Sequence, residues 1–426
     1  KRQMKSTLFT LSLFIFSWGF SQMSLDDQIA NIEDKVIEWR QHFHQNPELS
    51  NREFNTAKKI ELHLKSLGIK VQTDVAFTGV VGVLEGDNPG KVLGLRADMD
   101  ALPVYERTDL PFKSKATGIF NGEEVPVMHA CGHDTHIAIL MGVAEIMSKN
   151  TDKFNGTIKF IFQPAEEGAP QGEEGGAKLM IKEGVLTNPN VDAIFGLHIS
   201  SGQPVNTIAY KSGGIMAAAQ RFEINVTGKQ THGSLPWGGI DPIMASVKII
   251  DGLQTLVSRE AALTNEAVVI SVGKITSGVR SNIIPESAQI IGTIRTLDYD
   301  MQQQINDRMR EMVPAIAKAY RADATVKIDE GAEITYNDPA LTKQIVPSFE
   351  KAAGKENVLK IKAITGAEDF SFFQKEIPGV FFFLGGMTVG EMEAYPHHTP
   401  DFFIDESGLL LGVKTFAQMS LDYLNK

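Results

Sequence analysis

The sequence predicts an α/β protein in which a mostly parallel sheet is interrupted by a smaller inserted domain. Apolar runs of strand length alternate with helix-periodic segments as far as about residue 200, which is typical of a parallel sheet with helices on both faces. Between residues 214 and 329 the order of elements changes to βαββαβ, the order of a ferredoxin-like domain. A chain of 426 residues is also longer than one compact core usually grows, so we expect two domains.

The N-terminal segment has the pattern of an export signal. Three basic side chains precede an apolar run over residues 7–20, and small residues stand before Gln22. This run is shorter than the ~20 residues that span the hydrocarbon of a bilayer, which favours a cleaved signal over a membrane anchor. We therefore expect residues 1–21 to be removed, and the mature chain to be periplasmic or secreted with no stable membrane insertion.

The main domain is expected to comprise residues 22–213 and 330–426, on either side of the insertion. Its N-terminal part has helical apolar spacing, and Ser50 with Glu53 matches a capping box at the start of the second helix. The predicted helices are at residues 25–43, 51–67 and 136–149 and at the C-terminus. The predicted strands are at residues 80–84, 91–97, 156–163, 193–197 and 380–384.

The inserted domain, residues 214–329, is expected to pack two helices on one face of an antiparallel sheet. The sequence has no internal repeat, and no long linker joins this domain to the main domain. Its predicted strands are at residues 220–227, 267–274, 288–297 and 324–328, and its predicted helices are at 241–258 and 301–319.

The composition and charge narrow the class of ligand. Hydrophobic residues make up 42% of the chain and charged residues 22%, as in ordinary soluble globular proteins. The formal net charge is −11 and the sequence has no Lys/Arg cluster. Phosphate contacts need concentrated positive charge, so a nucleic acid or an anionic membrane is disfavoured as a partner. A small-molecule ligand fits better.

The single cysteine, Cys131, lies among histidines and an aspartate. A lone cysteine cannot form an intrachain disulfide and is by default a small buried hydrophobic residue. Cys131 and His133, however, stand two apart in a glycine-containing turn just ahead of a predicted helix, beside His129, Asp134 and His136. A thiolate and an imidazole so placed can reach one metal centre. We interpret the segment as metal-binding, with the other three residues in supporting roles.

Further polar side chains follow the predicted strands, where ligands collect in parallel sheets. Asp98 and Asp100 follow one strand, and Glu166 and Glu167 follow another. Adjacent carboxylates at a strand end point in different directions, so one can coordinate a metal while the other contacts a bound water. His198 ends a third apolar run, although a histidine in that position is more often a core residue.

Two other histidine sites carry weaker signals. His397 and His398 form a doublet in a proline-bounded loop near the C-terminus. His232 lies on a loop of the inserted domain, where the ordinary interpretation is solvent exposure. The pattern around these residues gives none of them a role without further information.

Six short motifs follow one another along the chain. They are RADMDALP at 96–103, MHACGHD at 128–134, FQPAEE at 162–167, NIIP at 282–285, GTIRT at 292–296 and GAEDFS at 366–371. Together they resemble the hippurate hydrolase and auxin-conjugate (IAA-amino acid) amidohydrolase branch of the di-metal aminoacylase and glutamate carboxypeptidase family, peptidase clan MH. The resemblance runs from about Trp39 to the C-terminus. It implies a metallohydrolase catalytic domain with an inserted dimerisation or lid domain.

This resemblance also implies an activity and a role for each site residue. The expected reaction is metal-dependent hydrolysis of the amide bond of N-acyl amino acids or similar small conjugates, with Glu166 as general base and acid. The partner subunit's His232 would reach the scissile carbonyl of a homodimer, and Asn282 and Arg295 would bind substrate. The ligands of two metal ions would be Cys131 as the bridge, His133, Glu167, His198 and His398, with His397 as the alternative to His398.

The sequence does not determine the substrate or the identity of the metal. Gln230 and Thr231 precede His232, and Trp237 follows Pro236, where relatives often carry glycine and histidine, so the acyl group and the amino acid are not fixed. A thiolate with imidazoles suits zinc, and manganese, cobalt and nickel accept the same ligand types.

Alternative functions fit the sequence less well. Carboxypeptidase or dipeptidase action is the nearest. A non-catalytic ligand- or metal-binding protein would not need Glu166. A cysteine hydrolase that uses Cys131 and His133 is disfavoured, because two residues apart is poor geometry for that pair and the paired glutamates would be unexplained. A nucleotide site at residues 86–91 lacks P-loop spacing.

Overall fold

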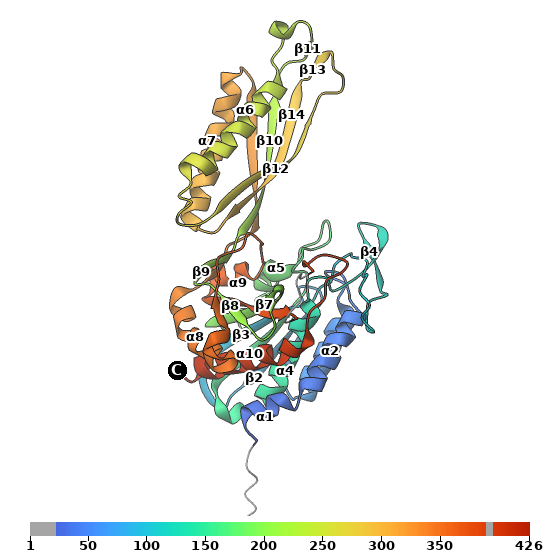
Figure 1. The fold of residues 1–426 in the computed structure, drawn as a ribbon, viewed down its shortest axis with the longest axis vertical. Coiled ribbons are helices and arrows are strands. Elements are labelled where there is room, and N and C mark those ends of the chain that lie inside the picture. Colours follow the sequence, from blue (N-terminus) through green and yellow to red (C-terminus); the bar gives the residue numbers. More distant parts are fainter. Residues whose placement is uncertain (1–22, 389–394) are drawn as a thin grey trace, which may run out of the picture.

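The computed structural model describes residues 23–388 and 395–426. The predicted signal, residues 1–21, lies outside the described residues. Two parts follow each other along the long axis of the molecule (Figure 1): a main domain built on an eight-stranded sheet and an inserted domain built on a four-stranded sheet. The α/β class and the insertion are therefore confirmed. None of the helices in the described ranges is both long and apolar enough to cross a bilayer.

The sheet of the main domain is mostly parallel, as predicted. Its strands are β1 (Lys70–Val75), β2 (Gly79–Glu85), β3 (Asn88–Asp98), β6 (Asn155–Gln163), β7 (Ala193–Pro204), β8 (Ile208–Tyr210), β17 (Val358–Lys360) and β18 (Gly379–Met387). They lie in the order β1-β2-β6-β3-β7-β18-β8-β17. The pairs β6–β3, β3–β7, β7–β18 and β8–β17 are parallel, and the other three pairs are antiparallel.

Helices cover both faces of this sheet. They are α1 (Leu25–Ala30), α2 (Glu33–Gln45), α3 (Phe54–Ser66), α4 (His133–Ser148), α5 (Gly176–Lys182), α8 (Pro339–Ala353), α9 (Ser371–Glu376) and α10 (Leu409–Leu424). Along β6 the side chains alternate, so that Phe160 and Phe162 pack with α4 and α10 while Ile161 packs with α5 and α9. Every residue of α4 from His133 to Met147 is buried, so this helix is fixed at the centre of the domain.

Short elements complete the main domain. These are the hairpin β4 (Thr117–Phe120) with β5 (Glu123–Pro126), and the ribbon β9 (Gly213–Met216) with β16 (Thr335–Asn337) at the join to the inserted domain. Single 3-10 turns occur in the main domain at residues 151–153, 355–357 and 406–408, and the inserted domain has another at 236–238 and a π turn at 256–260.

Two predictions about the N-terminal helices are wrong. The single helix 25–43 is divided in two between Ala30 and Glu33. The capping box does not form, because both of its side chains are used elsewhere. The Ser50 hydroxyl donates to the Asp100 carboxylate at 2.7 Å, and buried Glu53 accepts the Thr78 hydroxyl at 2.6 Å and the Ala165 N–H at 3.0 Å. Both residues connect the helix to strand ends instead.

The inserted domain has the predicted ferredoxin-like order. Its elements are β10 (Ala218–Thr227), β11 (Thr231–His232), α6 (Pro242–Thr255), β12 (Val268–Ser277), β13 (Ile283–Ile284), β14 (Ser287–Thr296), α7 (Tyr299–Ala319) and β15 (Asp323–Ala332). The sheet order is β12-β14-β10-β15 with antiparallel pairs throughout. Figure 1 shows α6 and α7 on one face of this sheet, where their apolar side chains form a separate core.

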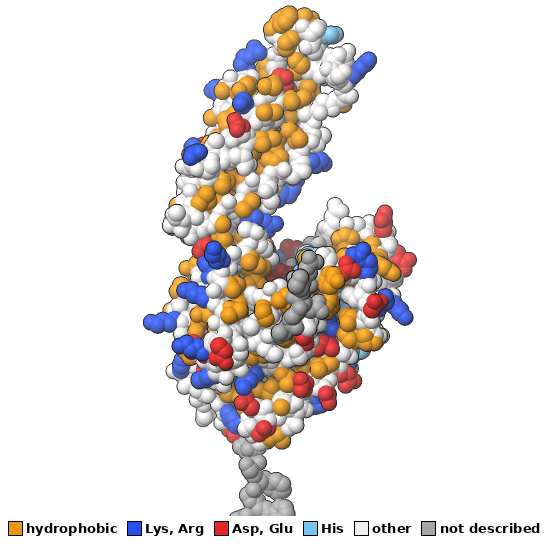
Figure 2. All heavy atoms as spheres, in the orientation of Figure 1, with side chains coloured by type: hydrophobic (Ala, Val, Ile, Leu, Met, Phe, Trp, Pro, Cys, Tyr) orange, Lys and Arg blue, Asp and Glu red, His pale blue; other side chains and the backbone are white. Residues whose placement is uncertain are grey.

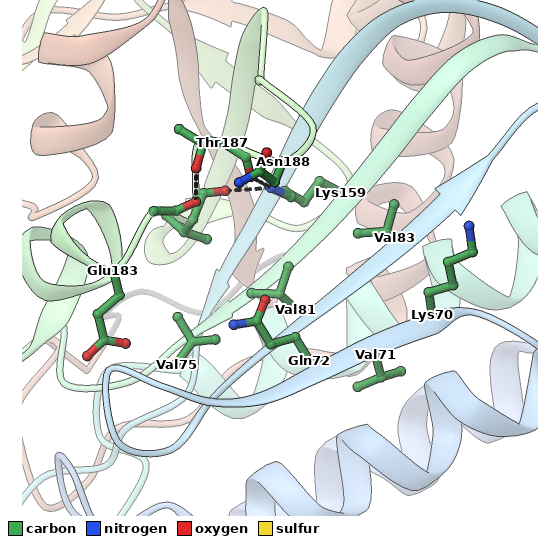
Figure 3. Close-up of a pocket in the computed structure, with 12 residues that line it drawn as sticks. Lys70, Val71, Gln72, Val75, Val81, Val83, Lys159, Glu183, Thr187 and Asn188 are labelled. Carbon is green, nitrogen blue, oxygen red and sulfur yellow. Dashed lines mark hydrogen bonds between the residues drawn. The ribbon is translucent and has the colours of Figure 1, made fainter.

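A cavity of about 340 Å³ lies on the β1–β2–β6 side of the main sheet (Figure 3). Lys159 borders it, with only 3% of the residue exposed. Its ammonium donates to the backbone carbonyls of Val185 at 2.8 Å, Thr187 at 2.7 Å and Pro189 at 3.4 Å. The lysine thus ties the loop after α5 to β6. None of the candidate metal-ligand clusters of the described residues borders this cavity, so we interpret it as structural.

Replacing Lys159 by methionine is expected to lower the free energy of unfolding by roughly 1–3 kcal/mol, because buried carbonyls lose their donor. Burial lowers the pKa of Lys159 from 10.5 to about 8. The unfolded chain therefore holds this proton at pH values where the folded chain has lost it, so stability rises between pH 8 and 10.5. Urea denaturation across that pH range should show the free energy of unfolding rising with pH in the wild type. The Lys159→Met variant should lack this rise.

Lys70→Met is the matched control. Lys70 borders the same cavity, but its side chain is 74% exposed and pairs with Glu85. Its replacement should change stability by less than about 0.5 kcal/mol. Equal losses in the two variants would contradict the anchoring role of Lys159.

Candidate metal centre

The predicted site residues meet where β3, β6 and β7 of the main sheet approach the start of α4. Asp98 ends β3, Glu166 and Glu167 follow β6, and His198 lies within β7, which continues beyond the predicted strand end. Figure 2 shows a recess between the main and inserted domains with acidic side chains at its depth. The cluster therefore lies at the carboxyl ends of the parallel strands, which is the edge of the sheet that the sequence predicts.

A glycine turn brings the cysteine segment to this edge. Gly132 has φ +92°, a conformation that residues with a Cβ rarely adopt. A Cβ at this position would lie 2.4 Å from Cγ2 of Ile199 on β7. Helix α4 begins directly afterwards at His133, three residues before its predicted start. The turn thus places Cys131 and His133 against β7, where any residue other than glycine would clash.

The five ligand residues implied by the resemblance converge in the structure. Cys131 Sγ lies 3.3 Å from His198 Nε2 and 3.2 Å from His398 Nε2. Glu167 Oε1 lies 3.0 Å from His398 Nε2 and 4.0 Å from His133 Nε2. Ligand atoms of Cys131, His133 and Glu167 all lie within 4.8 Å of one another. The thiol is central to the group.

Backbone hydrogen bonds fix the histidine rings. His133 Nδ1 lies 2.9 Å from the Asp100 carbonyl oxygen, and His198 Nδ1 lies 2.6 Å from the Ile199 carbonyl oxygen. A carbonyl can only accept, so each Nδ1 carries a hydrogen, and in the neutral ring, the form that binds a metal, each Nε2 has the lone pair. Both Nε2 atoms face the cluster. His133 Nε2 is buried without a hydrogen-bond partner, which is the state expected of a ligand for a cation.

The two C-terminal histidines differ in what their rings contact. His397 Nδ1 lies 3.1 Å from the Cys131 carbonyl oxygen, and its Nε2 accepts the Ser201 N–H at 3.3 Å. Both nitrogens of His397 are therefore occupied by backbone groups. His398 Nε2 instead lies beside Cys131 Sγ and the Glu167 carboxylate. His397 also falls within 4.8 Å of the thiol and His198. His398 Nε2, however, has side chains of the ligand set as its partners, so a cation there can replace the hydrogen that this nitrogen shares with Glu167.

The chemistry of this set fits a divalent cation. Burial, followed by the charges of Glu167 and Glu166, raises the pKa of the Cys131 thiol well above its usual value. A thiolate at this position needs compensating positive charge, which a metal ion supplies. The same surroundings make the free thiol a poor nucleophile, which argues further against a cysteine hydrolase. A soft ligand among imidazoles and a carboxylate is compatible with zinc.

Glu166 lies beside the set that Glu167 joins, with its Oε2 atom 3.9 Å from His133 Nε2. The backbone N–H groups of Glu166 and Glu167 both donate to the Asp100 carboxylate, at 3.1 and 3.0 Å, so this loop is held rigidly. The Glu166 side chain is 10% exposed. Burial, followed by the charges of Glu368 and Glu167, raises the pKa of Glu166 well above its usual value. A carboxyl with a raised pKa takes up a proton more readily than an exposed glutamate, as a general base must.

A buried ion network behind Glu166 was not predicted as part of the site. The Arg96 guanidinium, with no exposed surface, donates to Asp98 at 2.6 Å and to Glu368 and Asp369 at 2.9 Å each. The Asp369 N–H lies 3.4 Å from a Glu166 oxygen. Arg96 therefore links the end of β3 to the loop that faces the base. A charged residue inside the apolar β3 run was the sequence signal that could have revealed it.

Two of the three residues beside Cys131, His136 and Asp134, brace the site through polar contacts. His136 Nδ1 contacts Asp98 at 2.5 Å, and its Nε2 accepts the Ile199 N–H at 2.8 Å. Asp134 pairs with Arg40 and His44, each at 2.9 Å. His129 is buried with no hydrogen-bond partner at either ring nitrogen, and burial lowers its pKa to about 4.

The three predicted residues of the inserted domain do not join this cluster within one chain. His232 lies on β11, and Asn282 directly precedes β13, at the end of the inserted domain remote from the main sheet (Figure 1). Arg295 lies toward the opposite end of β14, paired with Ala219 near the join. His232 is exposed and its Nδ1 accepts the Ser234 N–H at 3.1 Å. Their roles in the reaction stay predictions.

Comparison with known proteins gives one consistent group. Residues 94–422 match the sequence profile of peptidase family M20/M25/M40. Thermostable carboxypeptidase 2 of Saccharolobus solfataricus is 42% identical over 94% of this chain and 98% of its own. IAA-amino acid hydrolase ILR1-like 2 of Arabidopsis thaliana is 36% identical over 99% and 95%. The crystal structure of the Bacillus subtilis YXEP protein, a dinuclear metal-binding peptidase from the M20 family, gives a TM-score of 0.78 at 34% identity, over 93% and 99%.

Proposed function

This chain belongs to peptidase family M20/M25/M40, a family of metal-dependent amidohydrolases and peptidases, and we propose that it hydrolyses the amide bond of N-acyl amino acids or similar small conjugates. The observation that carries the proposal is the buried Glu166 carboxyl beside a ligand set that fits two cations. A protein that only binds a metal or a ligand has no use for this base. The similarity to an IAA-amino acid hydrolase supports the substrate class.

We propose two divalent cations, with zinc as the first choice and manganese, cobalt or nickel as alternatives. When bound, they polarise the scissile carbonyl and acidify the attacking water. The similarity to a dinuclear metal-binding peptidase supports the number of ions. Their proposed ligands are Cys131 as the bridge, His133, Glu167, His198 and His398.

The remaining steps are assigned to the residues of the chain. Glu166 takes the proton of the attacking water and then donates it to the departing amine, so a single carboxyl serves as base and acid. Asp100 holds the backbone of Glu166 and Glu167, which keeps the base at a fixed distance from the ligand set. Arg96 anchors Asp98 and Asp369 on either side and so keeps this edge of the site rigid.

The activity can be tested with a substrate panel and a metal analysis of the same preparation. N-acyl amino acids with varied acyl groups should be hydrolysed faster than dipeptides and longer peptides. The resemblance to a carboxypeptidase makes peptide hydrolysis the specific alternative, and a preference for peptides would establish it. A fully metal-loaded protein that hydrolyses no member of the panel would rule out the proposed function and favour a binding protein.

We further propose a homodimer in which the partner subunit's His232 completes each active site. Its position at the far end of the inserted domain, exposed and remote from the cluster of its own chain, supports this arrangement. The tip also exposes Leu235 and Trp237, by 47% and 75%, and exposed apolar side chains of this kind are typical of contact surfaces.

Mixing two inactive variants is expected to restore activity in this dimer. Glu166→Gln and His232→Ala subunits each lack one required group. In a mixed dimer the site of the His232→Ala subunit has its own Glu166 and receives His232 from its partner, so one of the two sites is intact. Random exchange should give about a quarter of wild-type activity.

The mixture is measured after subunit exchange, beside each variant alone. Sedimentation velocity gives the oligomeric state. Activity of the mixture no higher than the mean of the two variants would show that His232 acts within its own chain or not at all.

A further inference from the structure

The turn that carries Glu166 and Glu167 begins at a residue with an unusual backbone conformation. Ala165 has φ +53°, in the left-handed region that residues with a Cβ rarely adopt. Its carbonyl oxygen accepts the Gly168 N–H at 3.4 Å, so Glu166 and Glu167 are the two central residues of a hydrogen-bonded turn. The direction in which both glutamate side chains leave the backbone therefore depends on the conformation of Ala165.

Alanine does not favour this conformation by itself. A glycine would adopt a positive φ without a steric penalty, whereas the Cβ of alanine opposes it. Ala165 is also only 2% exposed, so its backbone N–H needs an acceptor from the protein. Contacts with the surrounding structure must therefore hold Ala165 in the left-handed conformation.

Two buried carboxyl groups provide acceptors for this turn. Glu53 Oε1 accepts the Ala165 N–H at 3.0 Å. The Asp100 carboxylate accepts the next two N–H groups, those of Glu166 and Glu167, at 3.1 and 3.0 Å. Three consecutive N–H groups thus donate to side chains that are distant in sequence. Of these two carboxyl groups, Glu53 is the one that contacts the strained residue.

The Glu53 side chain is itself held in place. It directly precedes α3 and is fully buried, and its Oε2 atom accepts the hydroxyl of Thr78, which directly precedes β2, at 2.6 Å. One carboxyl oxygen is therefore fixed by Thr78 while the other contacts Ala165. A side chain whose orientation is set in this way holds the group that it contacts at a defined position. Neither of the two contacts involves a proposed metal ligand.

We propose that Glu53 is a positioning residue for the general base. By accepting the Ala165 N–H, it keeps Ala165 in the left-handed conformation and so holds the Glu166 carboxyl at the place where it meets the attacking water. The inference rests on the proposed amide hydrolysis, in which Glu166 transfers the proton. Glu53 acts through the backbone and takes no part in the proton transfer itself.

Replacing Glu53 by methionine tests this role, because methionine keeps the length of the side chain but has no oxygen to accept the Ala165 N–H. In metal-saturated enzyme, kcat should fall roughly 10- to 100-fold, as expected when a catalytic group is displaced by about 1 Å. KM should stay close to its wild-type value. Glu53→Gln keeps a carbonyl oxygen for Ala165 and offers its amide to Thr78, so its kcat should remain within a few-fold of the wild type.

Thr78→Val is the matched control, since it removes a hydrogen bond from the same carboxyl group but leaves the contact with Ala165. It should lower the melting temperature, as Glu53→Met does, and yet keep kcat near the wild-type value. Adding Ala165→Gly to Glu53→Met should recover much of the lost kcat, because glycine adopts the left-handed conformation without support. A purely structural role of Glu53 would give no such recovery.

Hydrogen exchange of peptides covering residues 163–168, followed by mass spectrometry, measures the same contact without turnover. The Ala165 amide should be protected in the wild type and in Glu53→Gln, and should exchange faster in Glu53→Met. Absence of turnover in the wild type with this exchange pattern intact would reject the proposed reaction alone.

Three outcomes would overturn the role of Glu53. The first is faster exchange in Glu53→Met with an unchanged kcat. The second is no recovery of kcat when Ala165→Gly is added to folded Glu53→Met. The third is a loss of kcat in folded Glu53→Gln as large as the one expected of Glu53→Met, which would assign the effect to the charge of Glu53. This third comparison decides the question even if Glu53→Met does not fold.

Discussion

Replacing Glu166 by glutamine is expected to lower kcat by roughly 10²- to 10⁴-fold, the usual contribution of a general base. Glutamine keeps the size of the side chain but cannot accept the proton of the attacking water. The ligand set does not include Glu166, so the metal content should stay at its wild-type value. Steady-state kinetics on an N-acyl amino acid and elemental analysis of the same samples give both quantities.

The control for this change is Glu174→Gln. Glu174 lies a few residues further along the same loop, 67% exposed and paired with Lys182, outside the ligand set. Its replacement should leave kcat unchanged. A Glu166→Gln variant that retains kcat within a few-fold while fully metal-loaded would remove Glu166 from the mechanism. A variant that has lost its metals would instead show that Glu166 serves as a ligand.

The fold class could be predicted from the sequence because each domain repeats a local pattern. Apolar strands alternating with helices predict the parallel sheet, and the βαββαβ order predicts the inserted domain. The errors lie where side chains form distant contacts instead of local ones. Ser50 and Glu53 match a capping box, yet Asp100 and the Thr78 and Ala165 groups compete for them successfully. A sequence window around the helix contains none of these competitors.

The site shows the same division between local and distant information. Motif spacing predicts Cys131 and His133, which lie at the start of α4, and the family resemblance adds Glu167, which follows β6. Contacts from Arg96 to Glu368 and Asp369 join residues 272 and 273 positions apart, and no local pattern encodes them. The β4–β5 hairpin was likewise not predicted, because it lies in a stretch with no strong strand periodicity. The sequence specifies which residues can bind a metal. The structure adds the residues, distant in sequence, that surround and position them.

Replacing His398 by alanine is expected to reduce bound metal below the wild-type content and to lower kcat/KM by at least roughly 100-fold, as when a catalytic metal loses a ligand that fixes its position. Wild-type enzyme treated with a chelator supplies the metal-free reference, and returning zinc or manganese to it should restore turnover. Metal binds only the folded chain, so the chelated enzyme should also be less stable, by about 4 kcal/mol at a metal concentration of 1,000 Kd. Elemental analysis, kinetics and thermal denaturation measure the three effects.

His397→Ala is the matched control, since it removes the same ring from the adjacent position. Both nitrogens of His397 contact backbone groups, the Cys131 carbonyl and the Ser201 N–H, so its loss should loosen the loop but leave most of the metal bound. His398 Nε2 lies instead beside Cys131 Sγ and Glu167, two side chains of the ligand set. If His397→Ala loses the metal and His398→Ala keeps it, the ring must turn away from the backbone when the cation binds, and His397 is the ligand. Equal metal loss in both variants would mean that each histidine serves one ion of the pair.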